Sequence, residues 1–186
     1  MPRIQVTGPG QANGRLQEIY DDLLNKRGKI AAVHTIQSLR PESIVRHMEL
    51  YMEIMFGRSE LSRAEREMIA VVVSSANGCS YCLAHHGEAL NHYWKDRPKV
   101  DALGQDFRSA ALSPKEMALC RFVRLLTTDP AAHEREDHTG RLRETGLSDA
   151  AILDAVLVTA YFNFVNRIVL SLGVELEEEA GKGFKY

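Results

Sequence analysis

The sequence predicts an all-α protein. Three observations support this: apolar residues recur at helical spacing, capping signals precede these segments, and no turn joins two alternating apolar runs into a hairpin. The chain has 186 residues, 45% hydrophobic and 26% charged, which is typical of a globular domain with a real core. We expect one domain over 1–186, with about eight to ten helices, a core over about 13–173 and a tail at 174–186.

Charge and targeting patterns exclude several classes of protein. The net charge of −2 argues against electrostatic binding of nucleic acid. Uninterrupted apolar runs such as Ile69–Val73 are far shorter than the about 20 residues of a membrane-spanning helix. The N-terminus has no apolar signal-peptide region, and three cysteines do not make a disulfide scaffold. We therefore expect a cytoplasmic protein without nucleic-acid or membrane partners.

The first two strong helices have recognisable ends. Asn13 can cap the start of the first helix, and Gly28 can end it. The apolar stripe of this helix is formed by Leu16, Ile19, Tyr20, Leu23 and Leu24. Pro41 suits the first position of the next, which should end at Gly57. This second helix carries three methionines that we assign to the core or to a subunit interface: Met48, Met52 and Met55.

Serines mark the start of the later helices. Ser62 with Glu65, and Ser113 with Glu116, have the spacing of a capping box. Ser148 is placed to cap a further helix. The β-branched runs Ile69–Val73 and Ala155–Thr159 are interpreted as helical, because both continue these capped segments. Patterns are weak at 1–12 and 95–111, and the acidic tail from 174 is expected to be a frayed surface segment.

A faint internal repeat is also visible. The segments that start at Ser62 and Ser148 each run to an asparagine, Asn77 and Asn163, and each is followed by a second helical pattern. Both units resemble an αα-hairpin with an asparagine at the corner. In the second unit, apolar residues replace the chemically reactive ones of the first, so only the first copy is expected to carry chemistry.

The most informative stretch begins directly after Asn77. Cys79 and Cys82 form a C-x-x-C pair, and His86 follows one turn later. On a helix that starts near Cys79, these three side chains share a face. A helix N-terminus favours thiolate over thiol, and an adjacent imidazole can take the proton. Such a dithiol can reduce a peroxide, because one sulfur becomes a sulfenic acid and the second condenses with it to a disulfide.

Glu67 lies on the preceding helix, from which its carboxylate could reach His86 in an antiparallel hairpin. The four residues read E-x11-C-x2-C-x3-H. This pattern resembles the signature of alkylhydroperoxidase D-like, peroxidase-related proteins of the carboxymuconolactone decarboxylase superfamily. The resemblance is strongest over about 61–90, and the helical pattern extends it over most of the chain.

The resemblance implies an all-helical fold, often in a homo-oligomer, and thiol-dependent reduction of organic hydroperoxides. It also implies that Cys82 attacks, Cys79 resolves, and His86 with Glu67 forms the proton relay. The best-known members have a second histidine immediately before the attacking cysteine, where this chain has Tyr81. Tyr81 could donate a hydrogen bond to a peroxide oxygen. His85 is a second auxiliary candidate, although it should point about 100° away from His86 and be exposed or structural.

Competing interpretations remain open at this level. The cysteines and His86 could bind structural zinc if a second ligand pair came from Cys120, His133, His138, His34 or His47. Cys120 is otherwise expected to be a buried small hydrophobe, and His133 and His138 a polar surface stretch. A third interpretation is a non-redox superfamily member with decarboxylase or lactone-type chemistry.

Asn163, Asn166 and Arg167 interrupt an apolar helix and need partners if they are buried.

The sequence therefore predicts a peroxidase of the antioxidant type, with a small hydroperoxide as substrate and an external dithiol or protein as reductant. We expect no metal, flavin or nucleotide cofactor, because no phosphate-binding glycine loop is present. Homo-oligomer formation is expected from the resemblance.

Overall fold

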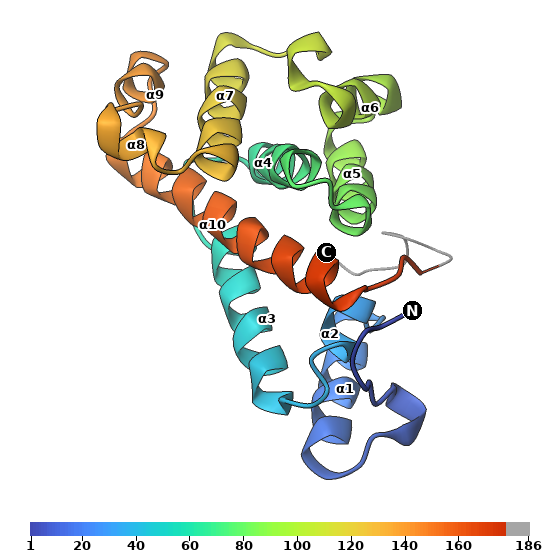
Figure 1. Ribbon diagram of the computed structural model, residues 1–186. Coiled ribbons are helices and arrows are strands. Elements are labelled where there is room, and N and C mark those ends of the chain that lie inside the picture. The colour runs from blue at the N-terminus through green and yellow to red at the C-terminus, as the bar shows by residue number, and fades with distance from the viewer. Residues whose placement is uncertain (178–186) are drawn as a thin grey trace.

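The computed structural model describes residues 1–177. Over this range it is helical without strands, as predicted (Figure 1). Two short 3-10 helices, Pro9–Gln11 and Phe107–Ser109, accompany ten α-helices in the described part of the chain. These are α1 (Gly14–Arg27), α2 (Ala32–Thr35), α3 (Pro41–Phe56), α4 (Arg63–Ala76), α5 (Ser80–Trp94), α6 (Arg97–Gln105), α7 (Pro114–Thr128), α8 (Ala132–Arg135), α9 (Gly140–Glu144) and α10 (Asp149–Leu172).

Helix α4 forms the centre of the core. It packs against α5, α7 and α10, and every residue of Ile69–Val73 is buried. The β-branched run is therefore helical, because α4 is covered on several sides and its apolar residues need not form one stripe. Ser62 and Glu65 make the predicted capping box at its start, and Ser113 and Glu116 make the one at the start of α7.

A tight corner joins α4 to α5. Asn77 ends α4, and Gly78 adopts a φ of +65°, a left-handed conformation that glycine reaches without strain. The chain then reverses, and Cys79 becomes the N-cap residue of α5. Its backbone N–H donates to the Ser74 carbonyl at 2.9 Å, which ties the start of α5 to the end of α4. This corner places the predicted dithiol next to the core helix.

The second unit of the predicted repeat is not a hairpin. Helix α10 runs without a break through Asn163. The reason is local, since Phe164 follows Asn163 where a glycine follows Asn77, so no residue favours a reversal. Asn163 therefore lies on one long helix, which crosses the molecule diagonally in Figure 1.

Helix α10 is also more apolar than its short runs indicated. An 18-residue stretch has a mean hydropathy of 1.5, enough in length and composition to cross a membrane, and 44% of that stretch is buried in the protein. Polar residues such as Thr159 and Asn166 divide this stretch, so that it contains no long uninterrupted apolar run. Both of these side chains are fully buried, and α10 packs against α3, α4 and α7.

Helices α1 and α3 form a smaller cluster beside the main core. Its buried residues are Leu16, Ile19, Tyr20, Leu23 and Ile44. Leu24, predicted on the same stripe, is half exposed. Gly28 ends α1 with a φ of +75°, as predicted. Of the three methionines on α3, Met55 is fully buried and Met52 is exposed, so that stripe is divided between core and surface.

One segment with a weak pattern contains a regular helix. The region 95–111 contains α6, whose start is capped by Asp96 through the Lys99 N–H at 3.1 Å. The predicted tail 174–186 is described as far as Glu177, while its residues 178–186 lie outside the described range. Near the tail, the Arg3 N–H donates to the Leu172 carbonyl at 2.9 Å, so the two ends of the described chain lie side by side (Figure 1).

Candidate active site

The C-x-x-C pair lies at the start of α5, buried against the core. Cys79 and Cys82 are 1% and 2% exposed, and both are free thiols. They differ in what they face, because Cys82 lies in the wall of a cavity of about 90 Å³. Several water molecules or a small ligand fit in such a space, since one water needs roughly 10–15 Å³ by the same measure. Cys82 is therefore the sulfur that a bound molecule meets.

The two thiols are electrostatically unequal. A hydrogen bond with the Cys82 thiol lowers the pKa of Cys79, against the effect of burial, and the backbone N–H groups of Cys82 and Tyr81 lower it further. The same hydrogen bond and burial raise the pKa of Cys82, while a hydrogen bond from Asn166 lowers it. The start of α5 thus favours negative charge on Cys79, as expected at a helix N-terminus.

The structure brings Glu67 and His86 together, a contact that the sequence allowed but did not determine. Glu67 Oε2 lies 2.7 Å from His86 Nδ1, and Glu67 Oε1 accepts a hydrogen bond from Arg63 Nη2 at 2.7 Å. The Glu67 side chain is fully buried, so Arg63 supplies the charge that balances its carboxylate. The edge of the His86 ring meets Phe162, with ring centroids 4.4 Å apart. His86 also lines the cavity, which places the end of this chain of contacts in the same space as Cys82.

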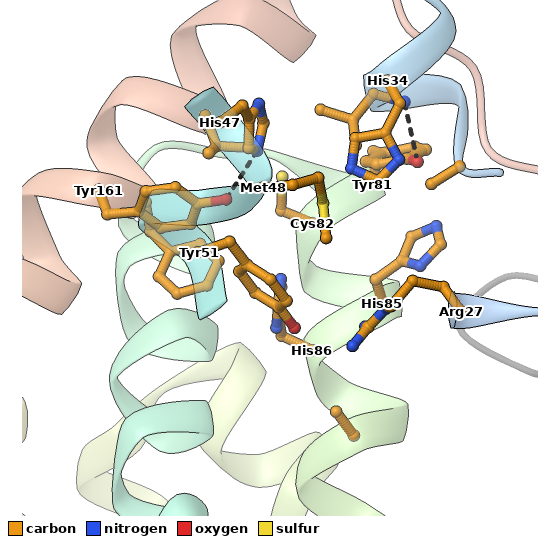
Figure 2. A pocket seen from close by; sticks show the side chains of 15 residues that line it. Arg27, His34, His47, Met48, Tyr51, Tyr81, Cys82, His85, His86 and Tyr161 are labelled. Carbon is orange, nitrogen blue, oxygen red and sulfur yellow. Dashed lines mark hydrogen bonds between the residues drawn. The ribbon is translucent and has the colours of Figure 1, made fainter. Parts of the chain in front are cut away.

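The remaining cavity wall combines apolar and aromatic side chains from α2, α3, α5 and α10 with the last residue of α1. Figure 2 shows Cys82 near the middle of this group, between Tyr161 on one side and Tyr81 on the other. The lining residues are Arg27, Ala31, Val33, His34, His47, Met48, Tyr51, Tyr81, Cys82, His85, His86, Ala89, Tyr161, Phe162 and Val165. Sequence reasoning missed the contributions of α2 and α3, which are distant from the motif along the chain.

The tail and His85 do not behave as expected. His85 lines the cavity, and its Nε2 lies 2.8 Å from Glu177 Oε2. The Tyr81 hydroxyl donates to Glu177 Oε1 at 2.9 Å. His85 is not exposed, since its side chain is 13% exposed and lines the cavity together with His86. The expectation of a frayed tail is wrong as far as Glu177, since these contacts hold its carboxylate.

A second histidine pair lies on the far side of the cavity. His47 contacts the Tyr161 hydroxyl through Nε2 at 2.7 Å and Gln37 through Nδ1 at 2.9 Å. The ring of His34 meets that of His47 edge-on, with centroids 5.6 Å apart. Burial lowers the pKa of His47 to about 4, and burial together with His47 lowers that of His34 to about 3. Both rings are therefore neutral at neutral pH.

The polar residues of α10 form a network under the dithiol. Asn77 Nδ2 donates to the side-chain oxygens of Asn163 at 3.1 Å and Asn166 at 3.0 Å. Asn166 is fully buried, and its Nδ2 lies 3.4 Å from Ser74 Oγ. Arg167 Nη1 donates to the Asn163 carbonyl and side-chain oxygens, both at 2.8 Å. The predicted need for partners is thus met, and Asn166 connects this network to Cys82.

The residues considered for zinc are spread over the molecule. Among the residues that the structure describes, no three His, Cys, Asp or Glu side chains gather into a group that could hold a metal ion. Cys120 is buried on α7, as predicted, and burial raises its pKa to about 12. The rings of His133 and His138 meet each other, with centroids 5.0 Å apart. The described geometry therefore favours a dithiol over a metal site.

Comparison with known proteins identifies the family. The carboxymuconolactone decarboxylase family pattern matches residues 42–124. The crystal structure of a peroxidase-related protein from Silicibacter sp. TM1040 is 30% identical, covers 99% of this chain and 98% of its own, and superposes with a TM-score of 0.85. A peroxidase-related protein from Ralstonia eutropha JMP134 with an alkylhydroperoxidase AhpD core is 26% identical, covers 97% and 94%, and also reaches 0.85.

A relative from another organism matches by sequence. The protein YdfG of Bacillus subtilis (strain 168) is 26% identical over 122 residues, which are 66% of this chain and 82% of YdfG. Together with the fold and the α4–α5 hairpin, these similarities agree with the resemblance that the C-x-x-C segment carries. The chain belongs to the alkylhydroperoxidase D-like proteins of the carboxymuconolactone decarboxylase superfamily.

Proposed function

We propose that this protein reduces organic hydroperoxides by cycling Cys79 and Cys82 between dithiol and disulfide. One observation carries the proposal: Cys82 lies in the wall of a cavity that also holds His86, the histidine bound to the buried Glu67. A nucleophilic sulfur, a second thiol and a base are the parts that such a reaction needs. The similarity to proteins described as peroxidase-related supports a role of this general kind.

In the proposed cycle, His86 takes the proton of Cys82 and the thiolate attacks the terminal oxygen of the hydroperoxide. The O–O bond breaks, and the leaving alkoxide takes the proton from His86 to become the alcohol. Cys82 is then a sulfenic acid. The sulfur of Cys79 attacks it, a disulfide forms and water leaves. The two thiols have supplied two electrons, and an external dithiol returns them by thiol–disulfide exchange. No metal or organic cofactor takes part.

The choice of Cys82 as the attacking sulfur depends on access. Cys79 has the lower pKa, but Cys82 is the one that faces the cavity. Attack requires contact between sulfur and peroxide oxygen, so we assign it to Cys82. Since burial and Cys79 hold the pKa of Cys82 high, proton removal by His86 becomes the demanding step. The stabilised charge on Cys79 suits the resolving role, in which it attacks as a thiolate.

Mass spectrometry tests this proposal. Metal-free, reduced protein treated with one equivalent of cumene hydroperoxide should lose two hydrogens, mapped to Cys79–Cys82, as peroxide disappears. Cys82→Ser should abolish peroxide consumption, and Cys79→Ser should accumulate a sulfenic acid on Cys82 that dimedone traps. Cys120→Ser is the matched control and should behave like the parent protein, because Cys120 lies on α7 away from the cavity lining. Unchanged thiols and persistent peroxide would overturn the proposal.

The superfamily also includes decarboxylases, and the family match supports this second candidate. Decarboxylase or lactone-type chemistry does not need a dithiol. Activity that survives replacement of both Cys79 and Cys82 by serine would favour it over peroxide reduction.

We further propose that the protein is a homo-oligomer and lies in the cytoplasm, where cellular thiols keep its dithiol reduced. The outer face of α10 supports self-association. Leu153, Leu157 and Phe164 share one side of that helix and are 57%, 41% and 48% exposed. Sedimentation analysis should show an oligomer that Leu157→Lys dissociates, and a monomeric parent protein would contradict this part of the proposal.

A further inference from the structure

The carboxylate of Glu177 is bound at the cavity by donors from two helices. It accepts from the backbone N–H of Ala32 at 2.6 Å and from the Tyr81 hydroxyl at 2.9 Å, and it lies 2.8 Å from His85 Nε2. Burial raises the pKa of Glu177, but hydrogen bonds from His85 and Ala32 outweigh it and bring the pKa to about 2. These donors therefore stabilise a negatively charged oxygen pair.

The donors are positioned by the fold as well as by the tail. Tyr81 is 5% exposed, and its hydroxyl accepts from the Val33 N–H at 3.3 Å, which leaves its proton for an anion. Its ring lies against that of His85, with centroids 4.5 Å apart. Arg27 adds a positive charge to the same cavity wall. The arrangement thus has the charge and geometry of an anion site, independent of which carboxylate occupies it.

A separate observation indicates a ligand in this cavity. His34 lines it and is 8% exposed, yet its Nδ1 has no hydrogen-bond partner among residues 1–177. Buried polar atoms are rarely left without a partner in a native protein. Because His34 is neutral at neutral pH, its ring can exchange a hydrogen bond with a small polar group. A bound molecule in the cavity would supply that group.

We propose that Tyr81, His85 and the Ala32 N–H form a carboxylate-binding subsite, which Glu177 occupies when no substrate is bound. The cavity that Cys82 lines is also lined by apolar side chains such as Val33, Phe162 and Val165. A ligand that fits has a carboxylate at one end and an apolar body. The reactive part of this inference depends on the proposed function: the preferred substrates are hydroperoxides that carry a carboxylate.

Binding of an unreactive carboxylate tests the subsite without any redox step. Calorimetry on reduced protein would compare hexanoate with 1-hexanol for the parent protein and three variants. Glu177→Ala removes the competing carboxylate and should tighten hexanoate binding by about 10-fold or more, with hexanol unchanged. Tyr81→Phe in the Glu177→Ala background should reverse most of this gain. Glu175→Ala is the matched control, because Glu175 lies on the same tail but pairs with the N-terminal amine.

Three results would overturn the subsite: no change of hexanoate affinity in Glu177→Ala, an equal gain for hexanol, or equally tight competition by inorganic phosphate. The last would show a general anion site rather than one for carboxylates. Circular dichroism verifies that each variant keeps its helices.

A kinetic comparison separates the subsite from the proposed function. If both hold, kcat/KM should be higher for 6-hydroperoxyhexanoic acid than for its methyl ester, and Tyr81→Phe should remove the difference. Selective hexanoate binding without reduction of either peroxide would support the subsite and contradict the proposed function. Equal reduction of acid and ester without hexanoate binding would support the function and overturn the subsite.

Discussion

Glu67 on α4 and His86 on α5 meet at 2.7 Å between Oε2 and Nδ1, across the hairpin that carries the dithiol. The carboxylate is fully buried and also binds Arg63, so its position is held from both sides. A carboxylate that accepts the Nδ1 proton leaves Nε2 as the basic nitrogen of the ring. This pairing orients the imidazole as a proton acceptor, and the first two predictions follow from it.

His86→Gln should slow oxidation of the dithiol by about 10²- to 10⁴-fold, because it removes the base that takes the Cys82 proton. The Glu67–Arg63 pair stays intact in this variant, so the fold should be preserved. Stopped-flow measurement of peroxide consumption gives the rate. The control is His92→Gln, since His92 is an exposed histidine on the same helix. Equal rates for parent and His86→Gln would remove this residue from the mechanism.

Glu67→Gln should lower the free energy of unfolding by about 3–5 kcal/mol, because it leaves the Arg63 guanidinium without its buried partner. Urea unfolding followed by circular dichroism measures the loss. Glu65→Gln provides the comparison, since Glu65 is partly exposed at the start of the same helix and removing its charge there should cost about 0.3–1 kcal/mol. Similar losses in the two variants would show that the buried pair does not stabilise the fold.

Asn166→Ala should destabilise the protein by about 1–3 kcal/mol, because it removes one of the two acceptors of the Asn77 amide and the contact with the buried Ser74 hydroxyl. It should also raise the pKa of Cys82 further, since the hydrogen bond from Asn166 lowers it. Iodoacetamide alkylation rates as a function of pH report the second effect. Asn91→Ala is the matched control, because Asn91 Oδ1 has no partner in the described part of the chain. An unchanged alkylation profile would contradict the role of Asn166.

The free energy of unfolding should decrease as the pH is lowered through the range in which His34 and His47 would become charged in the unfolded chain. The folded-state pKa is about 3 for His34 and about 4 for His47, both below the ordinary 6.5. The unfolded chain therefore binds more protons as pH drops. The contribution of the two histidines to the free energy of unfolding is fully present above about pH 6.5. It declines by up to about 1.4 kcal/mol per pH unit per histidine toward pH 4.

Urea unfolding between pH 7 and pH 4 measures this slope. His34→Gln should flatten it by the contribution of one histidine, whereas the exposed His92→Gln should leave it unchanged. An identical slope in His34→Gln and the parent would show that His34 does not titrate between the two states.

Much of the fold was predictable because its signals are local. Capping boxes at Ser62 and Ser113, the helix start at Pro41 and the left-handed Gly28 all act within a few residues of chain, and each was found where predicted. The predicted hairpin around Asn163 was wrong because the local signal for a reversal is absent there. It relied on a likeness to Asn77, but the glycine that makes the first corner has no counterpart in α10.

The sequence by itself determined the all-helical class, the α4–α5 hairpin and the grouping of Cys79, Cys82 and His86, because spacing along one helix decides which side chains share a face. It left open whether Glu67 contacts His86 or faces solvent. Only the tertiary structure decided what surrounds them. His34, His47 and Tyr161 reach the cavity from α2, α3 and α10, and Glu177 contacts the lining residues Tyr81 and His85 from the tail. Such contacts depend on how helices distant along the chain pack together, and helical periodicity carries no information about a partner helix.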